Sequence, residues 1–282
     1  MSVMRKVRNR LTRMRRRGWR NRSWHSPERH IIVGGAPRSG TTLIRRMLDR
    51  HPSICCGPES SIFLPGSILI GPVAAGFKMP AEELRVMLDS SPSQGAFIDA
   101  FATRYREMRG RPRWAEKTPL NVRSIDWILE RFPESRFVHV VRDGRDVVCS
   151  MREHPERRWV DGAWVTEQSQ LSLAAHAKRW VADAEAGIAH RGDPRYLEVR
   201  YEDLVQDPEG LVRGLMEQLG EAYYPELIPD PDKPTKSGKV HANSAIRTRS
   251  MGRWRTDLTP EEQESVQRIA GPTLARLGYP SD

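Results

Sequence analysis

The pattern of apolar and polar residues along the chain predicts strands that alternate with helices. Short runs of apolar β-forming residues mark strands near residues 31–34, 136–141 and 195–199. Apolar residues at helical spacing predict helices over residues 41–51, 79–90, 97–108, 124–132, 168–190, 208–219 and 259–277. This alternation favours an α/β fold, in which a central parallel sheet is flanked by helices on both faces.

The first predicted strand leads into a loop that is suited to an anion. Residues 34–42 read Gly-Gly-Ala-Pro-Arg-Ser-Gly-Thr-Thr and are followed by a predicted helix. Backbone N–H groups at the start of a helix bind phosphate well. The spacing of Gly35 and Gly40 is that of a nucleotide phosphate loop, but Thr41 stands where the lysine of an NTPase would be. We therefore expect a P-loop-like phosphate site without a Mg-bound triphosphate, formed by Arg38, Ser39, Gly40, Thr41 and Thr42.

A second candidate phosphate site follows the predicted strand at residues 136–141. Arg142 comes directly after this strand, and Ser150 follows eight residues later. The carboxyl ends of parallel strands meet at one edge of a sheet, so we expect this site to lie beside the first loop. His139 lies within the strand, where a histidine packed in the core is the favoured interpretation.

The net charge of +10 is concentrated at the N-terminus. Residues 1–30 hold eleven of the 46 Lys and Arg residues but one of the 36 acidic residues, which leaves 35 of each sign in residues 31–282. We expect residues 1–30 to form either a disordered tail or an amphipathic helix on an anionic membrane. Residues 31–282 are expected to form one domain. Because the positive and negative charges of this domain balance, nucleic-acid binding rests on residues 1–30 alone and is a minor alternative.

Three cysteines, Cys55, Cys56 and Cys149, do not have the spacing of a metal site or of a disulfide framework. We therefore expect no metal and a reducing compartment. The chain has no apolar run near the roughly 18 residues that a membrane-spanning helix needs. The sequence accordingly predicts a cytoplasmic protein, peripheral to a membrane if residues 1–30 bind one.

Residues 33–59, VGGAPRSGTTLIRRMLDRHPSICCGPE, resemble sulfotransferases that use 3′-phosphoadenosine-5′-phosphosulfate (PAPS). The likeness is to the tyrosylprotein-sulfotransferase-like branch, whose first loop reads Pro-Arg-Ser-Gly-Thr-Thr. The resemblance implies the sulfotransferase fold and transfer of a sulfuryl group from PAPS to an acceptor hydroxyl. The product 3′-phosphoadenosine-5′-phosphate (PAP) is left behind, and no metal takes part.

The resemblance also assigns roles to the catalytic residues. Glu59 matches the general base of these enzymes, and Lys117 matches the lysine that binds the bridging and sulfuryl oxygens. Arg38 would stabilise charge on the sulfuryl group and the leaving phosphate. Arg142 and Ser150 match the pair that holds the 3′-phosphate.

Further nucleotide contacts are expected toward the C-terminus. Tyr201 matches a tyrosine that contacts the nucleotide, although a tyrosine that only anchors the turn is an alternative. Arg253 matches a basic residue that contacts phosphate, and Trp254 is expected to pack against the adenine. Ser244 is the candidate for a serine that binds the phosphosulfate, with Ser237 as its competitor. Residues 152–167 are expected to form a loop over the site.

Two positions where the chain departs from the resembling enzymes bear on the acceptor. Ser61 stands where the resembling enzymes have an arginine that reads acidic peptides, and Ala115 stands where lumenal members have a disulfide cysteine. These departures favour a small-molecule, sugar or lipid-linked hydroxyl as acceptor, with a peptide tyrosine as the alternative. Two functions of other classes stay open as alternatives: a P-loop kinase or NTPase, and a nucleic-acid-binding protein. A homodimer is also possible from the sequence.

Overall fold

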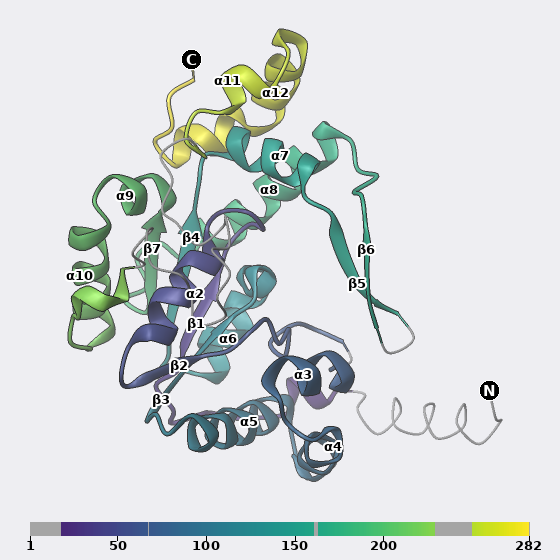
Figure 1. The fold of residues 1–282 in the computed structure, drawn as a ribbon, viewed down its shortest axis with the longest axis vertical. Coiled ribbons are helices and arrows are strands. Elements are labelled where there is room, and N and C mark those ends of the chain that lie inside the picture. The colour runs from purple at the N-terminus through teal and green to yellow at the C-terminus, as the bar shows by residue number, and fades with distance from the viewer. Residues whose placement is uncertain (1–17, 67, 161–162, 229–249, 282) are drawn as a thin grey trace, which may run out of the picture.

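The computed structural model describes residues 18–66, 68–160, 163–228 and 250–281. A five-stranded parallel sheet lies at its centre, with the strand order β2-β3-β1-β4-β7 (Figure 1). The strands are β1 (Ile31–Gly34), β2 (Ile54–Cys56), β3 (Arg113–Lys117), β4 (Arg136–Val141) and β7 (Tyr196–Arg200). Strands β1, β4 and β7 coincide with the predicted ones, whereas the sequence analysis did not predict β2 and β3.

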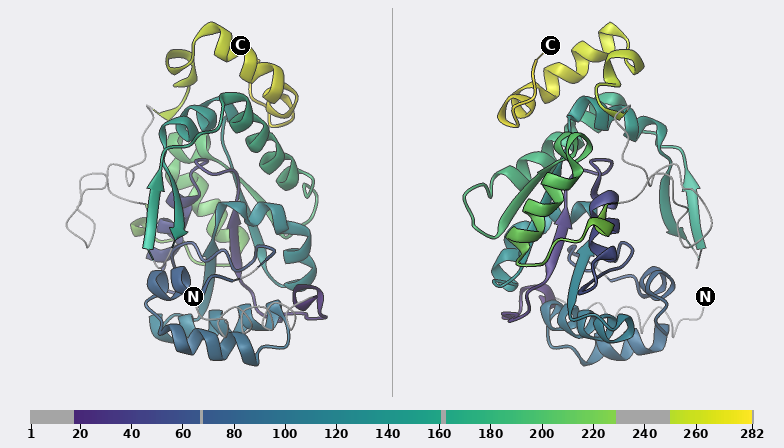
Figure 2. Two further views of the ribbon diagram at one scale, coloured as in Figure 1. Left: turned by 90° about the vertical axis from the view of Figure 1, so that its right-hand side faces the viewer. Right: turned by 60° about the vertical axis from the view of Figure 1, so that its left-hand side comes forward.

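Helices cover both faces of this sheet, which confirms the predicted α/β architecture (Figures 1 and 2). The α-helices are α2 (Thr41–Arg50), α3 (Ile70–Phe77), α4 (Ala81–Ser90), α5 (Gln94–Arg109), α6 (Ile125–Arg131), α7 (Gly144–Glu153), α8 (Leu173–Ile188), α9 (Tyr201–Gln206), α10 (Pro208–Leu219), α11 (Trp254–Asp257) and α12 (Pro260–Arg276). The described residues also form the short 3₁₀ helices η1 (Trp19–Asn21), η2 (Pro119–Ser124) and η3 (Pro225–Leu227).

The alternation of side chains along the strands divides the core into two halves. Ile32, Trp114 and Phe137 point to one face, where they pack with residues of α3, α4, α5 and α6. Ile31 and Val33 point to the other face, where they pack with residues of α2 and α10. A third apolar cluster joins α7, α8 and α12 above β4. Helices α11 and α12 lie at the end of the molecule opposite α4 and α5 (Figure 1).

Residues 18–30 pack onto the domain. The side chain of Trp19 is buried, and its indole N–H donates to the backbone oxygen of Ser91. The carboxylate of Asp99 on α5 accepts hydrogen bonds from Trp24, Ser26 and His30. The packed part of the chain therefore begins before the boundary expected at residue 30, while residues 1–17 lie outside the described residues.

Residues 152–167 do not form the expected loop. After the end of α7 they form a two-stranded antiparallel ribbon, β5 (Glu156–Val160) and β6 (Ala163–Glu167), which extends toward α3 (Figure 1). The rings of Trp159 and Trp164 pack edge to face, with their centroids 5.2 Å apart. A Cβ added to Gly71 of α3 would lie 3.1 Å from the Trp159 indole nitrogen, so the ribbon and α3 are in contact. This cross-strand aromatic pair helps explain why the segment forms strands.

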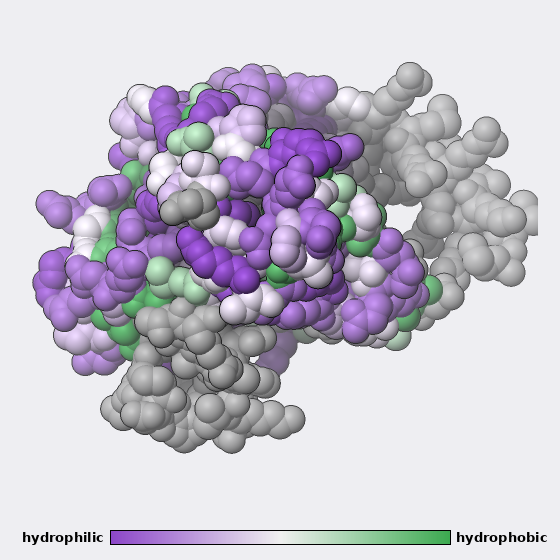
Figure 3. All heavy atoms as spheres, turned by 90° about the horizontal axis from the view of Figure 1, so that it is seen from above, coloured by the Kyte–Doolittle hydropathy of each residue, from purple (hydrophilic) through white to green (hydrophobic). Residues whose placement is uncertain are grey.

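The surface of the molecule is mainly hydrophilic on the side shown in Figure 3, where hydrophobic residues form small separate patches. Within the described ranges, none of the helices has both the length and the apolar character that crossing a bilayer requires. Those ranges also contain no cluster of three or more His, Cys, Asp or Glu side chains arranged to hold a metal ion.

Candidate active site

Two glycines allow the loop between β1 and α2 to lie close to its neighbours. Gly35 has a φ of +145°, and a Cβ there would lie 2.3 Å from the backbone oxygen of Val140 in β4. Gly40 has a φ of +102°, and a Cβ there would lie 2.6 Å from the ring of Tyr201. Because a side chain would be strained and would clash at both positions, the loop depends on glycine here.

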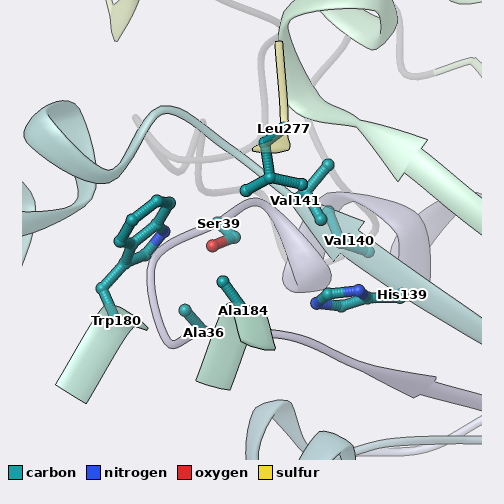
Figure 4. A pocket seen from close by; sticks show the side chains of 8 residues that line it. All are labelled: Ala36, Ser39, His139, Val140, Val141, Trp180, Ala184 and Leu277. Atoms are coloured by element: carbon teal, nitrogen blue, oxygen red, sulfur yellow. The ribbon is translucent and has the colours of Figure 1, made fainter. Parts of the chain in front are cut away.

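The hydroxyl of Ser39 in this loop is buried and has no hydrogen-bond partner among the described residues. Figure 4 shows the Ser39 side chain at a narrow hollow behind the loop, lined by apolar side chains such as Ala36, Trp180 and Ala184. The hollow has no room for a water molecule, so it is not the binding site.

Arg38 lies between the two expected phosphate sites. Its Nε donates to the Oγ of Ser150 on α7 at 3.1 Å, and its backbone oxygen accepts from Arg142 at 3.0 Å. Burial and the positive charge of Arg142 lower the pKa of Arg38, while the carboxylate of Glu59 raises it. Arg38 also has a φ of +74°, a strained backbone conformation of the kind found at functional sites. The structure therefore brings the two sites together around this side chain.

Arg142 is buried at the carboxyl end of β4. Its guanidinium carbon lies 4.6 Å from the centre of the Tyr201 ring, which in turn faces Gly40. Its two terminal nitrogens donate to the backbone oxygens of Arg38 and Ser250, whereas its Nε has no partner in the described part of the chain. Tyr201 thus serves as the packing surface between the loop and Arg142, and a direct nucleotide contact by Tyr201 stays a prediction.

Glu59 and Lys117 form an ion pair on the other side of the loop. The Nζ of Lys117 donates to a carboxylate oxygen of Glu59 and to the hydroxyl of Thr42 on α2, at 3.3 Å in the second case. The Lys117 side chain is 3% exposed, whereas the Glu59 side chain is 51% exposed. The carboxylate can therefore be approached from solvent, while the cation faces the loop.

The C-terminal contacts agree less well with the expectations. Trp254 is buried, and its ring stacks against the guanidinium of Arg145, 4.1 Å from the ring centre. Arg253 forms ion pairs with Glu153 and Asp257, so contact with a phosphate would require these pairs to open. The roles of Trp254 and Arg253 stay predictions. Ser244 and its competitor Ser237 both lie outside the described residues.

The sequence analysis missed two buried carboxylates near the site. Asp146 accepts hydrogen bonds from the backbone N–H groups of Gly252 and Trp254, and so holds the C-terminal segment against α7. Glu116, next to Lys117, accepts four hydrogen bonds: two from Ser60, one from Thr118 and one from Asn121. No sequence signal marked either residue, because the strand that carries Glu116 was not predicted and Asp146 lies on a polar turn of α7. His139, in contrast, is a buried core residue that hydrogen-bonds to Tyr196, as the sequence predicts.

The chain resembles several curated proteins along most of its length. It is 29% identical over 88% of its length to protein-tyrosine sulfotransferase 2 of Gallus gallus, of which it covers 69%. It is 28% identical over 91% of its length to human protein-tyrosine sulfotransferase 1, of which it covers 71%.

Solved structures and a family model agree with this similarity. The fold is similar to the sulfotransferase domain of the Synechococcus PCC 7002 olefin synthase, with a TM-score of 0.58 and 21% identity, over 89% of this chain and 96% of that one. It is also similar to mouse sulfotransferase SULT7A1 in complex with PAP, with a TM-score of 0.54 and 15% identity, over 89% of this chain and 86% of that one. The model of the sulfotransferase family matches residues 30–226. The chain belongs to the sulfotransferase family.

Proposed function

We propose that this protein transfers a sulfuryl group from PAPS to the hydroxyl of a tyrosine in a polypeptide. The observation that carries the proposal is the position of Arg38, which joins the phosphate loop, Ser150 and Arg142 into one basic site, with Glu59 and Lys117 beside it. The relatives named above as protein-tyrosine sulfotransferases favour tyrosine over the small-molecule acceptor that the sequence analysis preferred.

The donor-binding residues fit a molecule with two separate phosphate groups. One buried donor next to Arg38 has no partner in the described part of the chain, the Nε of Arg142 after β4. Under the proposal, the loop and its helix bind the 5′-phosphosulfate, and Arg142 with Ser150 binds the 3′-phosphate. The family membership favours this over the NTPase alternative, which lacks its lysine at Thr41.

The reaction we propose is an in-line displacement at sulfur. Glu59 takes the proton of the tyrosine hydroxyl while the phenolic oxygen attacks the sulfur atom. A bond forms between that oxygen and sulfur, and the bond between sulfur and the 5′-phosphate oxygen breaks. The products are the sulfate ester and PAP. Lys117 and Arg38 stabilise the charge that develops on the sulfuryl group and the leaving phosphate.

The ion pair between Lys117 and Glu59 fits these roles. An anionic donor beside Thr42 competes for the ammonium of Lys117 and leaves the carboxylate of Glu59 for the acceptor. The half-exposed position of Glu59 lets a side chain on a bulky polypeptide reach it from solvent. A base enclosed in a deep pocket would instead favour a small acceptor.

Transfer assays with labelled PAPS test the proposal. We expect a tyrosine peptide to be labelled and the same peptide with Phe in place of Tyr to stay unlabelled. Labelling of small phenols or sugars without labelling of the peptide would overturn the acceptor assignment. Calorimetry should show tighter binding of PAP than of AMP or ATP, and a preference for ATP would overturn the donor assignment.

The role of Glu59 is tested by Glu59→Ala. We expect kcat to fall by roughly 10²- to 10⁴-fold with PAP still bound, because general base catalysis contributes about this much. Glu130→Ala is the matched control, since its side chain is 60% exposed and pairs with an arginine far from the site. A Glu59→Ala enzyme as active as this control would contradict the assignment.

Expectations about the N-terminal segment are not part of this proposal. Residues 1–17, most of the segment expected to bind an anionic membrane, lie outside the described residues. The cytoplasmic location and the homodimer likewise stay predictions.

A further inference from the structure

Two successive amides directly after Glu59 are bound by side chains of the segment at the end of β3. The N–H of Ser60 donates to Oε1 of Glu116 at 3.1 Å, and the Ser60 hydroxyl donates to the same oxygen at 2.7 Å. The N–H of Ser61 donates to the hydroxyl of Thr118 at 3.1 Å. The backbone that carries Glu59 is therefore fastened at two consecutive positions.

Lys117 lies between the two side chains that hold this backbone. Successive side chains of a strand point to opposite sides, so Glu116 points away from the side on which Lys117 reaches Glu59. Residues 59–61 and 116–118 thus meet in three pairs: Glu59 with Lys117, Ser60 with Glu116, and Ser61 with Thr118. We call Glu116 and Thr118, which bind the backbone on either side of the Lys117 pair, the two anchors. The distance between the expected base and the expected cation depends on these anchors.

Of these two residues, Glu116 makes hydrogen bonds to more parts of the chain than Thr118 does. Its side chain is fully buried, and its Oε1 accepts a third hydrogen bond, from the hydroxyl of Thr118 at 2.7 Å. Its Oε2 accepts from the side-chain amide of Asn121, which also donates to the backbone oxygen of Val33 in β1. Burial raises the pKa of Glu116, while the bonds from Ser60, Thr118 and Asn121 lower it. Glu116 therefore connects three parts of the sheet edge: the Glu59 segment, the end of β3 and the end of β1.

The backbone at Ser61 shows that this segment does not adopt its shape by local preference. Ser61 has a φ of +56°, in the left-handed region that a serine rarely adopts. Such a conformation persists only where the surroundings hold it. The hydrogen bonds of Ser60 to Glu116 and of Ser61 to Thr118 are among the contacts that hold it here.

We infer that Glu116 is a positioning residue, which holds the segment bearing Glu59 against the strand bearing Lys117 and so sets the geometry of base and cation. This inference rests on the proposed function for the roles of Glu59 and Lys117. Glu116 itself does not touch the reacting atoms, because its oxygens are occupied by Ser60, Thr118 and Asn121.

The test compares Glu116→Ala, Glu116→Gln and the control Asp99→Ala. Asp99 is a similar carboxylate with three hydrogen bonds, but it lies on α5 at the amino end of β1, away from the site. In Glu116→Ala we expect kcat to fall on the order of 100-fold, the loss typical of a small displacement of reacting groups, with PAP affinity unchanged. Glu116→Gln keeps an oxygen for Ser60 and Thr118, so most of the turnover should return.

The outcomes separate positioning from simple stability. A merely structural role would lower the melting temperature in Glu116→Ala and Asp99→Ala alike and reduce kcat only with the folded fraction. The inference is overturned if kcat of Glu116→Ala falls no further than that of Asp99→Ala, or if Glu116→Gln is as slow as Glu116→Ala. Should Glu116→Ala not fold, Thr118→Val decides, since a lower kcat at constant PAP affinity supports the inference and an unchanged kcat overturns it.

Hydrogen exchange provides a measurement that does not depend on activity. The amide of Ser60 should exchange faster in Glu116→Ala, and the amide of Ser61 should exchange faster in Thr118→Val, than in the wild-type protein, with no change in residues 24–30. In Glu116→Gln, which keeps the accepting oxygen, the amide of Ser60 should exchange nearly as in the wild-type protein. Failure of the wild-type protein to bind PAP or to transfer sulfate would refute the proposed function but leave this exchange measurable. Unchanged exchange at both amides would refute the positioning role itself.

Discussion

Replacing Arg142 by lysine tests whether the pocket after β4 binds the 3′-phosphate of the donor. Lysine keeps a positive charge but lacks the planar guanidinium and its Nε. We expect weaker binding of PAP, which has a 3′-phosphate, and little change for AMP, which does not. The comparison of the two ligands removes effects of the substitution on the rest of the site.

The size of the effect follows from the contacts of Arg142. Its two terminal nitrogens already donate to the backbone oxygens of Arg38 and Ser250, and its Nε is the atom without a partner in the described ranges. The phosphate would therefore gain one new charge-assisted hydrogen bond from a buried donor, which contributes about 1.5–3 kcal/mol. This corresponds to a loss of PAP affinity of roughly 10- to 150-fold in Arg142→Lys.

Isothermal titration calorimetry with PAP and AMP on both proteins measures this difference. Arg106→Lys serves as the control, because Arg106 forms a two-bond ion pair with Glu28 away from the site. An equal loss of affinity for PAP and AMP would show that Arg142 shapes the loop through Arg38 and does not recognise the 3′-phosphate. An unchanged PAP affinity would refute the reasoning altogether.

Three further predictions concern the surroundings of the site. Gly35→Ala should lower the free energy of unfolding by at least about 2 kcal/mol in urea titrations, because the new Cβ meets the Val140 oxygen at 2.3 Å; a smaller loss would contradict the close approach. Burial lowers the pKa of His139 from 6.5 to about 4, so the unfolded chain binds the proton more readily, and stability should fall by about 2 kcal/mol between pH 8 and pH 5. His139→Gln should lose that part of the pH dependence, and a variant with the full dependence would refute the assignment. Arg253→Gln should leave PAP affinity nearly unchanged, since Glu153 and Asp257 already occupy this guanidinium; a loss like that of Arg142→Lys would show that the pairs open.

The fold class could be predicted from the sequence because its signals are local, and the two candidate anion sites, which stay predictions, rest on signals of the same kind. The strand, the Gly-rich turn and the helix of the loop are adjacent in the chain, as are β4 and Arg142. Strands β2 and β3 escaped prediction for an equally physical reason. They are three and five residues long, and β3 contains Arg113, Glu116 and Lys117, which the apolar pattern excludes. They are strands because their neighbours in the sheet pair with them.

The pattern of apolar and polar residues could not predict contacts between segments that are distant in the sequence. The hydrogen bond from Arg38 to Ser150 joins residues 112 positions apart, and no periodicity encodes it. The ribbon at residues 156–167 was expected to be a loop because its arginines and glycine conceal the pairing of Trp159 with Trp164. The acceptor preference, in turn, relied on the departures at Ser61 and Ala115, which the overall similarity to the relatives outweighs.

The order of strands in the sheet separates the residues proposed to act on the acceptor from the residue proposed to bind the 3′-phosphate of the donor. β1 lies in the middle, with β3 and β2 on one flank and β4 and β7 on the other. Under the proposed roles, the base Glu59 and the cation Lys117 lie at or just after the ends of strands on the first flank, whereas Arg142, which would bind the 3′-phosphate, follows a strand on the second. The groups that act on the acceptor and the group that binds the 3′-phosphate therefore lie on opposite sides of β1. Substitutions around β2 and α3 can then alter which hydroxyl is modified while the handling of the shared donor is preserved.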